Sequence, residues 1–413
     1  MVFPDVAYSF DLPKMVPVKQ LFPDEHIESV DDCVKKEFAQ ESIQAKIRPG
    51  DSVAVLVGSR GIARIAEVIR CVVRELKAIG ADPFIVPAMG SHGDGKAALQ
   101  KEILESYGIT EAFTGAPIRS SMETVVVGET PEGIPVHVDK NASLADAVVP
   151  VCRVKAHTDF HGKYESGICK MLAIGIGKHN GCSRIHKEPV DDFPTVIPNY
   201  ARVVMEKLYV PFAVAIVENA HEHIHTLKAV PGEKILEEEP GLLCLSKSLM
   251  PSLQFPHIDV LVVQQIGKEI SGTGMDPNII GRLAEKPPTE YYGPTINRVV
   301  VNDLSPASHN NGNGIGVADY TTRRVLEKMD FDAMYTNCVA SADPRCGRMP
   351  IVLDSEEDAL RAAVFSSFPK NGYAGASVVW ILDTLYLTEI KVSESLLDYC
   401  RQHPGFAVPD TDR

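Results

Sequence analysis

The chain has 413 residues, a length that predicts about two domains. Of these residues 45% are hydrophobic and 23% charged, a composition typical of a globular protein. A net charge of −14 disfavours nucleic acid as a partner, because nucleic-acid phosphates would be repelled. The longest apolar runs, such as 258–263, have the length of a strand and are too short to span a membrane.

The cysteines and the N-terminus indicate the cellular compartment in which the protein is expected. The nine cysteines are scattered without a C-x-x-C pair, which indicates reduced thiols rather than a disulfide framework or a structural zinc site. The N-terminus lacks a basic region followed by an apolar core, so no secretory signal is expected. We therefore expect a cytoplasmic protein.

A βαβ unit is predicted near the N-terminus, after a short helix at 31–38. The apolar run 52–57 is typical of a buried strand, and a helix at 62–79 follows it, with Ser59 as the expected N-cap and Gly80 as the expected C-cap. The next strand is predicted at 83–88. Ligands of such units bind outside the carboxyl ends of the strands.

Two loops occupy that position, Gly58–Arg60 and Met89–Asp94. His92 lies in the second loop, directly before a helix predicted at 96–106. A lone histidine is more often structural or solvated than catalytic, but its place at a strand's carboxyl end favours a function.

The stretch 155–187 is rich in polar residues and glycine and follows a buried strand predicted at 147–154. It holds four of the 13 histidines, namely His157, His161, His179 and His186. Imidazole and ammonium groups spaced by glycines indicate a ligand-holding loop that enters a helix. A solvated surface loop without function is the alternative.

Strands and helices alternate through the rest of the chain, which predicts α/β architecture with mostly parallel sheets. We expect an N-terminal domain at 1–250, a linker at 251–256 and a C-terminal domain at 257–413, with the active site in the cleft between the domains. The remaining predicted elements are a hairpin (123–127 and 134–138), strands (212–217, 258–264, 298–302, 377–382 and 388–392) and helices (197–208, 235–249, 317–329 and 355–367).

Two further segments resemble binding motifs only loosely. Alternation places His221, His223 and His225 on one side of an extended segment, which could bind a metal, but no cysteine or carboxylate is identified that completes a tetrahedral set. The glycine-rich loop 267–276 resembles a phosphate cradle, yet no Lys-Ser/Thr pair follows at the spacing of a Walker A motif.

The sequence lacks G-x-S-x-G, and G-x-G-x-x-G after the first strand, which disfavours the common hydrolase and dinucleotide-binding classes. An H-E-x-x-H match at 221–225 falls on the segment predicted to be extended, whereas the zincin motif requires a helix, so the zincin class is disfavoured as well. The motifs that it does carry resemble those of the nickel-pincer-nucleotide lactate racemase family. These motifs are Gly90-Ser91-His92, His157 followed by Phe160-x-Gly162, Ser166-Gly167-x-x-Lys170, and His186 sixteen positions after Lys170. Their order and spacing, including the gap between Arg60 and His92, carry the resemblance over nearly the whole chain.

The resemblance implies a cofactor made from a pyridinium mononucleotide, in which two sulfur-bearing arms and a ring carbon hold Ni(II). By position, Lys170 is the expected thioamide tether, and His186 is the expected nickel ligand. Ser166, Gly167 and Arg60 are expected to contact the cofactor. Imidazole and thiolate-type sulfur both suit nickel. Enzymes that make the cofactor are then implied as partners, and a homo-oligomer is compatible with the sequence.

The implied reaction is the racemisation or epimerisation of a small-molecule 2-hydroxy acid, which makes the chain an isomerase. The α-hydrogen of such an acid is too weakly acidic for direct removal, whereas its transfer as hydride to the cofactor avoids a carbanion. Inversion needs an acid/base group on each face, and His92 and His157 are the expected pair. The Arg60 guanidinium is a candidate for binding the substrate carboxylate.

The sequence departs from the family pattern at three places. The acidic residue expected three positions before Arg60 is Val57, and the expected Gln and Lys of the C-terminal domain fall on Gly281 and Ala284. The loop between His157 and Lys170 is also longer than in lactate racemase. These differences favour a larger or differently charged 2-hydroxy acid, such as a sugar acid, with Lys268 or Arg282 as substitute substrate-binding residues.

Three alternatives to a racemase stay open. The first is an oxidoreductase that uses the same cofactor and stops at the keto acid. The second is a non-catalytic family member that binds a nucleotide or metal, which the presence of both candidate bases, the lysine and the nickel ligand disfavours. The last is a zinc hydrolase that uses the His221, His223 and His225 set.

Overall fold

The computed structural model describes residues 9–58, 61–284, 288, 290–341 and 343–409. The chain forms two compact units: a central unit of residues 23–250, and a terminal unit that combines residues 1–22 with 251–413. The predicted N-terminal domain of 1–250 therefore differs from the central unit in its first 22 residues. The reason is β1 (Met15–Gln20), whose hydrogen bonds to β14 (Glu389–Ser393) place it in the terminal unit's sheet.

The central unit has a five-stranded sheet in the order β3-β2-β6-β7-β8, with only β8 antiparallel to its neighbour, and a separate hairpin of β4 and β5. Its strands are β2 (Ser52–Val57), β3 (Asp82–Pro87), β4 (Thr124–Glu129), β5 (Pro135–Asp139), β6 (Ala147–Arg153), β7 (Phe212–Glu218) and β8 (Ile224–Pro231). Its helices are α1 (Val30–Phe38), α2 (Glu41–Gln44), α3 (Ile65–Ile79), α4 (Ala97–Ser106), α5 (Glu111–Thr114), α6 (Lys140–Ser143), α7 (Ile168–Lys170), α8 (Lys178–Ile185), α9 (Phe193–Lys207) and α10 (Ile235–Leu249).

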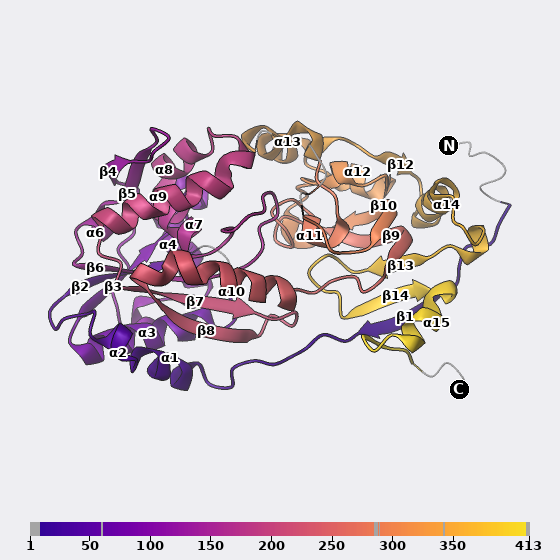
Figure 1. Ribbon diagram of the computed structural model, residues 1–413. Coiled ribbons are helices and arrows are strands. Elements are labelled where there is room, and N and C mark those ends of the chain that lie inside the picture. The colour runs from indigo at the N-terminus through magenta and orange to yellow at the C-terminus, as the bar shows by residue number, and fades with distance from the viewer. Residues whose placement is uncertain (1–8, 59–60, 285–287, 289, 342, 410–413) are drawn as a thin grey trace. The chain divides into compact units, whose positions relative to one another are not determined.

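Helices cover both faces of this sheet, which explains why its four parallel strands are largely apolar (Figure 1). In β2, Val53, Val55 and Val57 pack in the core formed with α1 and α3. Ala54 and Leu56, which point the other way, pack in the core formed with α7, α9 and α10. The predicted C-cap Gly80 of α3 is confirmed by its left-handed conformation, with φ of +96°.

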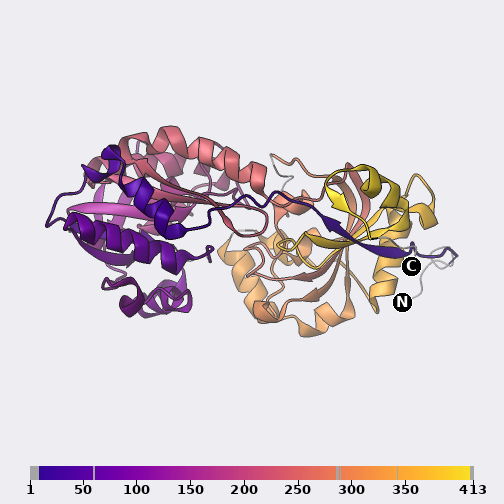
Figure 2. The same cartoon turned by 90° about the horizontal axis from the view of Figure 1, so that it is seen from below.

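The terminal unit has an eight-stranded mixed sheet in the order β12-β11-β10-β9-β13-β14-β1-β15, in which the strands from β12 to β13 are parallel. In Figure 2 this unit is orange to yellow, apart from the indigo segment at its N-terminus. Its other strands are β9 (His257–Ile266), β10 (Thr295–Leu304), β11 (Tyr320–Thr322), β12 (Ile351–Leu353), β13 (Val378–Ile381) and β15 (Phe406–Ala407). Its helices are α11 (Pro277–Ile280), α12 (Arg323–Lys328), α13 (Phe331–Ala340), α14 (Glu356–Ser367) and α15 (Leu397–Gln402).

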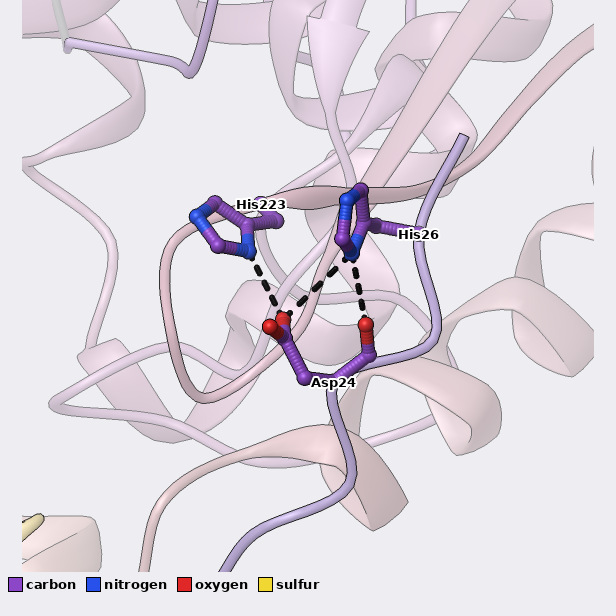
Figure 3. A group of neighbouring side chains, drawn as sticks. All are labelled: Asp24, His26 and His223. Carbon is purple, nitrogen blue, oxygen red and sulfur yellow. Dashed lines mark hydrogen bonds and ion pairs between the residues drawn. The ribbon is translucent and has the colours of Figure 1, made fainter. Parts of the chain in front are cut away.

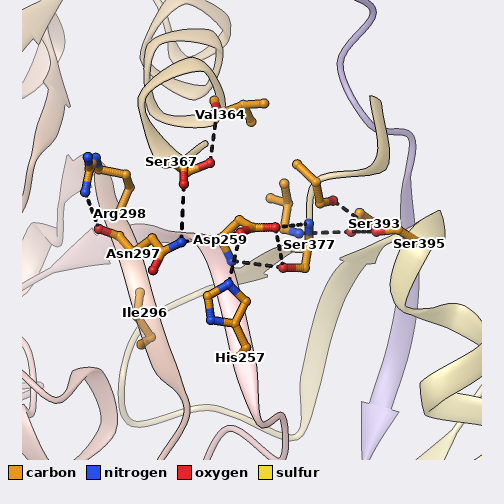
Figure 4. Close-up of polar contacts among 12 residues, drawn as sticks. His257, Asp259, Ile296, Asn297, Arg298, Val364, Ser367, Ser377, Ser393 and Ser395 are labelled. Carbon is orange, nitrogen blue, oxygen red and sulfur yellow. Dashed lines mark hydrogen bonds and ion pairs between the residues drawn. The ribbon is translucent and has the colours of Figure 1, made fainter. Parts of the chain in front are cut away.

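A polar network ties the terminal unit's parallel strands together near their amino ends (Figure 4). The buried Asp259 carboxylate accepts hydrogen bonds from the Ser377 backbone N–H (2.8 Å) and hydroxyl (2.7 Å), and lies 3.0 Å from His257 Nε2. Asn297 donates to the Ser367 carbonyl oxygen at 3.3 Å. These bonds satisfy buried polar groups where β9, β10 and β13 begin.

The predicted fold class, two α/β units with mostly parallel sheets, is confirmed. The predicted helix at 317–329 is wrong in its first part, because Tyr320–Thr322 forms β11 between β10 and β12. β-Branched threonines favour a strand there, and the Thr322 hydroxyl caps the shorter helix α12 by accepting from the Val325 N–H. The predicted N-cap Ser59 lies outside the described residues.

Two global expectations can be compared with the structure. All nine cysteines lie in the described part of the chain as free thiols. A search of the helices in the described ranges finds none that combines the length and the apolarity needed to cross a membrane.

Candidate active site

The candidate residues follow strands whose carboxyl ends meet at one edge of the central sheet. β3, β2 and β6 are parallel neighbours, so the segments that follow them share this edge. His92 follows β3, and His157 follows β6. The sheet order therefore brings together two loops that are 65 positions apart in the sequence.

The His92 loop is shaped by close backbone packing. Gly90 has φ of +59°, and a Cβ atom there would lie 3.3 Å from Cys182 Sγ and 3.2 Å from the Ile174 carbonyl oxygen. The buried Gln100 side chain donates to the carbonyl oxygens of Gly90 (2.9 Å) and His92 (3.0 Å). The loop backbone is thus fixed, while the His92 side chain is exposed.

Gln100 is itself held by a buried ion pair. Lys178 Nζ lies 3.3 Å from Gln100 Oε1 and 3.3 Å from Asp139 Oδ2, and both charged side chains are fully buried. Burial lowers the pKa of Lys178 and raises that of Asp139, and the attraction between the two charges opposes both shifts. Removal of either partner would leave an unpaired buried charge.

The His157 loop folds around the carboxylate of Glu165, whose side chain is fully buried. This carboxylate accepts from the backbone N–H groups of His157 (2.7 Å) and Gly162 (3.1 Å). It also pairs with Lys247 of α10 at 2.8 Å and with His161 at 3.4 Å. Glu165 therefore fixes the backbone of the candidate base from inside the loop.

The ring of His157 is stacked and desolvated. It packs on Phe160 with ring centroids 4.2 Å apart, and only 16% of its side chain is exposed. Burial, with a further contribution from the Lys170 charge, lowers the pKa of His157 well below its usual value. Its Nδ1 accepts the Asp159 backbone N–H at 3.0 Å, so the neutral ring carries its proton on Nε2 and can donate a hydrogen bond there.

Lys170 ends α7 and directly precedes a π-helical turn, Met171–Gly175. Such turns are rare and occur frequently at functional sites. The buried Glu239 carboxylate supports α7 by accepting from the Cys169 backbone N–H at 3.0 Å. A Cβ atom at Gly167 would lie 2.1 Å from Glu239 Oε1, so only glycine fits there.

His186 follows α8, and its Nδ1 lies 2.7 Å from the Cys182 carbonyl oxygen. Because a carbonyl can only accept, Nδ1 carries the proton, and in the neutral ring Nε2 keeps its lone pair. Contact with the Cys182 side chain raises the pKa of His186, against the opposing effect of burial.

Two phenylalanines join these residues into one cluster. Phe160 and Phe193 are packed edge to face with centroids 5.5 Å apart. The Phe160 ring contacts His157 on its face and lies 5.8 Å from Lys170 Nζ, and the Phe193 ring lies 5.4 Å from that of His186. The His92 loop connects through Ser91, whose hydroxyl lies 3.5 Å from Cys182 Sγ, which in turn lies 3.6 Å from His186 Nδ1.

Two other predicted cofactor-binding residues lie beside Lys170. Ser166 forms a backbone bridge with Lys155 (2.9 and 3.2 Å), and Gly167 begins α7. Sequence reasoning missed the supporting residues Gln100, Glu165 and Glu239. The local sequence gives no signal for them, since Glu239, for example, is the last of three consecutive glutamates at the start of α10.

The predicted substrate-binding residues lie outside the described part of the central unit. Arg60 lies outside the described residues. Lys268 is in the terminal unit, is exposed and bonds to Asn337. Arg282 pairs with Asp319 at 2.7 Å and donates to the carbonyl oxygens of 296, 297 and 317, a structural role within the terminal unit.

The departure from the family pattern at Gly281 has a structural reason, and the nearby Asp276 has a structural role. Gly281 has φ of +66°, and a Cβ atom there would lie 2.5 Å from the Tyr291 ring, so a glutamine cannot be accommodated. Asp276 caps α11 by accepting from the Asn278 backbone N–H at 2.9 Å.

The suggested metal set of His221, His223 and His225 does not converge within the described ranges. His225 Nδ1 instead bonds to the Thr226 hydroxyl at 2.8 Å.

Comparisons with known proteins bear on the family and on the fold. Residues 12–193 match the family model of the lactate racemase N-terminal domain. The lactate racemase apoprotein of Thermoanaerobacterium thermosaccharolyticum is similar in structure, with a TM-score of 0.52 and 12% identity over 90% of this chain and 99% of that chain. A crystal structure of a Thermotoga maritima protein gives a TM-score of 0.53 and 15% identity over 87% and 97%. No protein of curated function matches.

The family match confirms the predicted resemblance over residues 12–193, and the two structural likenesses support the same fold.

Proposed function

We propose that this protein is an isomerase that inverts the C2 centre of a 2-hydroxy acid, because its residues 12–193 match the family model of the lactate racemase N-terminal domain. The observation that carries this proposal is the cluster of His157, Lys170 and His186 around one pair of phenylalanines, with the His92 loop beside it. These groups come from separate elements at one sheet edge, where α/β units bind ligands.

The residues present fit a nickel-pincer nucleotide. His186 holds its Nδ1 proton on a backbone carbonyl, the arrangement by which a histidine presents Nε2 to a metal, and imidazole suits Ni(II). Lys170, at the start of the π-helical turn, is the proposed covalent tether, with Ser166 and Gly167 beside it. When bound, the cofactor would supply a site that takes hydride from the substrate and returns it.

The protein's own residues handle the hydroxyl proton. As hydride leaves C2, a base must take the proton from the hydroxyl group, and an acid must return one when the hydride comes back. Burial lowers the pKa of His157 and favours its neutral ring, the form that takes up a proton, and the ring can return that proton only from its charged form. The His92 side chain is exposed on a fixed loop and would act on the opposite face of the substrate.

The substrate carboxylate needs a cationic partner, and Arg60 of the segment after β2 is our candidate. The absence of space for a side chain at Gly281 supports a substrate other than lactate. We expect a larger or differently charged 2-hydroxy acid.

An isotope experiment tests the proposal directly. The protein, co-produced with the cofactor-making enzymes, is incubated with single enantiomers of a panel of C2-deuterated 2-hydroxy acids. Hydride transfer predicts inverted product that keeps deuterium at C2, whereas proton abstraction would exchange it with water. Release of the keto acid without inversion would instead identify an oxidoreductase, and no turnover by fully loaded protein would count against the enzyme assignment.

Matched variants test the residue roles. His92→Ala and His157→Ala should each abolish inversion, while His225→Ala, a histidine of β8 in the same unit, should behave as wild type. Inversion at the wild-type rate in both loop variants would refute the two-histidine assignment.

A further inference from the structure

We propose that Asp24, His26 and His223 form a binding site for a divalent metal of the zinc class, distinct from the candidate active site (Figure 3). Asp24 and His26 lie in the segment that leads into α1, and His223 lies in the turn between β7 and β8. None of the three belongs to the cluster of His92, His157, Lys170 and His186.

The donor atoms already lie near the spacing that a metal requires. The Asp24 Oδ1 atom is 2.7 Å from His223 Nδ1 and 3.5 Å from His26 Nδ1. One donor atom from each residue lies within 4.8 Å of the others. Metal–ligand bonds of about 2.0–2.2 Å in a tetrahedral site place donors about 3.4 Å apart. Because His26 Nδ1 also lies 2.6 Å from the Asp24 carbonyl oxygen, both Nδ1 atoms carry a proton that they share with an oxygen of Asp24. Metal binding therefore requires small side-chain rotations and the release of these two protons.

The rings and the carboxylate face one another across two distant parts of the chain. Figure 3 shows the two imidazoles on either side of the Asp24 carboxylate, and their ring centroids are 4.7 Å apart. Asp24 and His223 are 199 positions apart in the sequence. All three side chains are exposed, so water can complete the coordination.

The side chain of the buried Asn219 supports the proposed site through hydrogen bonds to both of its segments. Asn219 is 5% exposed, and its amide nitrogen donates to Asp24 Oδ1 (3.0 Å) and to the Glu25 carbonyl oxygen (3.2 Å). Its amide oxygen accepts the backbone N–H groups of His221 (3.0 Å) and His223 (3.1 Å). A hydrogen bond to a ligating carboxylate is the support that metal sites use in their outer shell.

A backbone bond fixes the two segments in register. The Ile27 N–H donates to the Ile224 carbonyl oxygen at 2.8 Å, one residue beyond each histidine. The relative position of His26 and His223 therefore depends on the main chain and on Asn219, rather than on the side chains alone. A site held in this way loses little conformational entropy when it binds a metal.

The ligand chemistry selects the metal class. Two imidazoles and one carboxylate suit Zn²⁺, Cu²⁺, Co²⁺ or Ni²⁺. Mg²⁺ and Ca²⁺ prefer sets made of oxygen atoms alone. A bound metal would join the segment before α1 to the β7–β8 turn, which would stabilise the entry of the chain into the central unit.

The test uses full-length protein without a tag and without cofactor, titrated with Zn²⁺ by calorimetry and with Co²⁺ by visible absorption. His26→Ala and His223→Ala should each remove one equivalent of bound metal, or weaken its binding at least tenfold, and should abolish the tetrahedral Co²⁺ band of that equivalent. The matched control is His225→Ala, because the His225 ring bonds to Thr226 and lies outside the group. Asp24→Asn, which keeps the side-chain shape, provides a second ligand variant.

Equal stoichiometry and affinity in wild type, His223→Ala and Asp24→Asn would overturn the proposal. Binding of Mg²⁺ as tight as that of Zn²⁺ would overturn the metal class. Thermal unfolding in the presence of a chelator checks that each variant is folded, and Zn²⁺ should raise the melting temperature of wild type and of His225→Ala but not of His223→Ala.

Discussion

The buried carboxylate of Glu165 gives the sharpest test of how the His157 loop is held. In Glu165→Gln the side chain keeps its shape but loses its charge, and one of its two acceptor oxygens becomes a donor. That atom then faces the N–H of His157 or Gly162, which the carboxylate accepts at 2.7 and 3.1 Å in the wild type. The ion pair with Lys247 at 2.8 Å is lost as well.

The expected cost follows from these contacts. A hydrogen bond to a charged group contributes about 1.5–3 kcal/mol, and a buried donor left unsatisfied costs about 1–3 kcal/mol. The Lys247 contribution is smaller, because 26% of its side chain is exposed and solvent screens the pair. We expect the free energy of unfolding to fall by about 3 kcal/mol in Glu165→Gln.

The pH dependence has a definite sign. Burial raises the pKa of Glu165, but hydrogen bonds from His161, Lys247 and two backbone N–H groups outweigh it, so the pKa lies below the usual 4.5. The stabilisation by the charged form is therefore complete above pH 4.5 and is lost as the pH falls through the lowered pKa. The difference between wild type and variant should shrink in acid.

Urea unfolding at pH 7 and at pH 4 measures both effects. The control is Glu123→Gln, since Glu123 pairs with Lys140 at the similar distance of 2.7 Å but is 68% exposed, and no measurable change is expected. An unfolding midpoint of Glu165→Gln equal to that of wild type at pH 7 would refute the role of this carboxylate.

Three further changes test other parts of the site. Gln100→Leu leaves the Gly90 and His92 carbonyls without their donor and should lower kcat at least tenfold in the inversion assay; an unchanged kcat would show that the loop does not need it. Gly175→Ala places a Cβ atom 2.7 Å from the Ala88 carbonyl oxygen and should cost about 1–3 kcal/mol in urea unfolding, whereas no loss would show that the π-helical turn can shift. Burial raises the pKa of Glu239 to about 7, so the free energy of unfolding of the wild type should fall as the pH rises from 4.5 to 7. Glu239→Gln should lack this pH dependence, and an equal pH dependence in both proteins would contradict a neutral buried carboxyl group.

The sheet and helix pattern was largely readable from the sequence. The run at 52–57, the glycine at 80 and the following strand define the first βαβ unit, because buried parallel strands are continuously apolar and a left-handed cap favours glycine. The strand at 320–322 was hidden, because three residues are too few to show a period and the helix that follows begins at once. The pairing of β1 with β14 depends on contacts across the whole length of the chain, which a local pattern cannot show.

The candidate site was readable only in part. His92 and His157 each follow the carboxyl end of a predicted strand, whereas Lys170 and His186 were assigned through their resemblance to the family motifs. Their supports, such as Glu165 and Gln100, act through burial and backbone bonds, and nothing in the local sequence distinguishes them from surface polar residues. The meeting of His223 with Asp24 also depends on the fold alone.

The central claim is that Lys170 carries a nickel-containing nucleotide, and intact-mass spectrometry tests it most directly. Protein co-produced with the cofactor-making enzymes should carry a covalent adduct that maps to Lys170, together with nickel at the active site. The adduct should be absent from Lys170→Ala and present in Lys163→Ala, a change at an exposed lysine of the same loop. Unmodified wild-type protein under these conditions, or an adduct that persists in Lys170→Ala, would contradict the account.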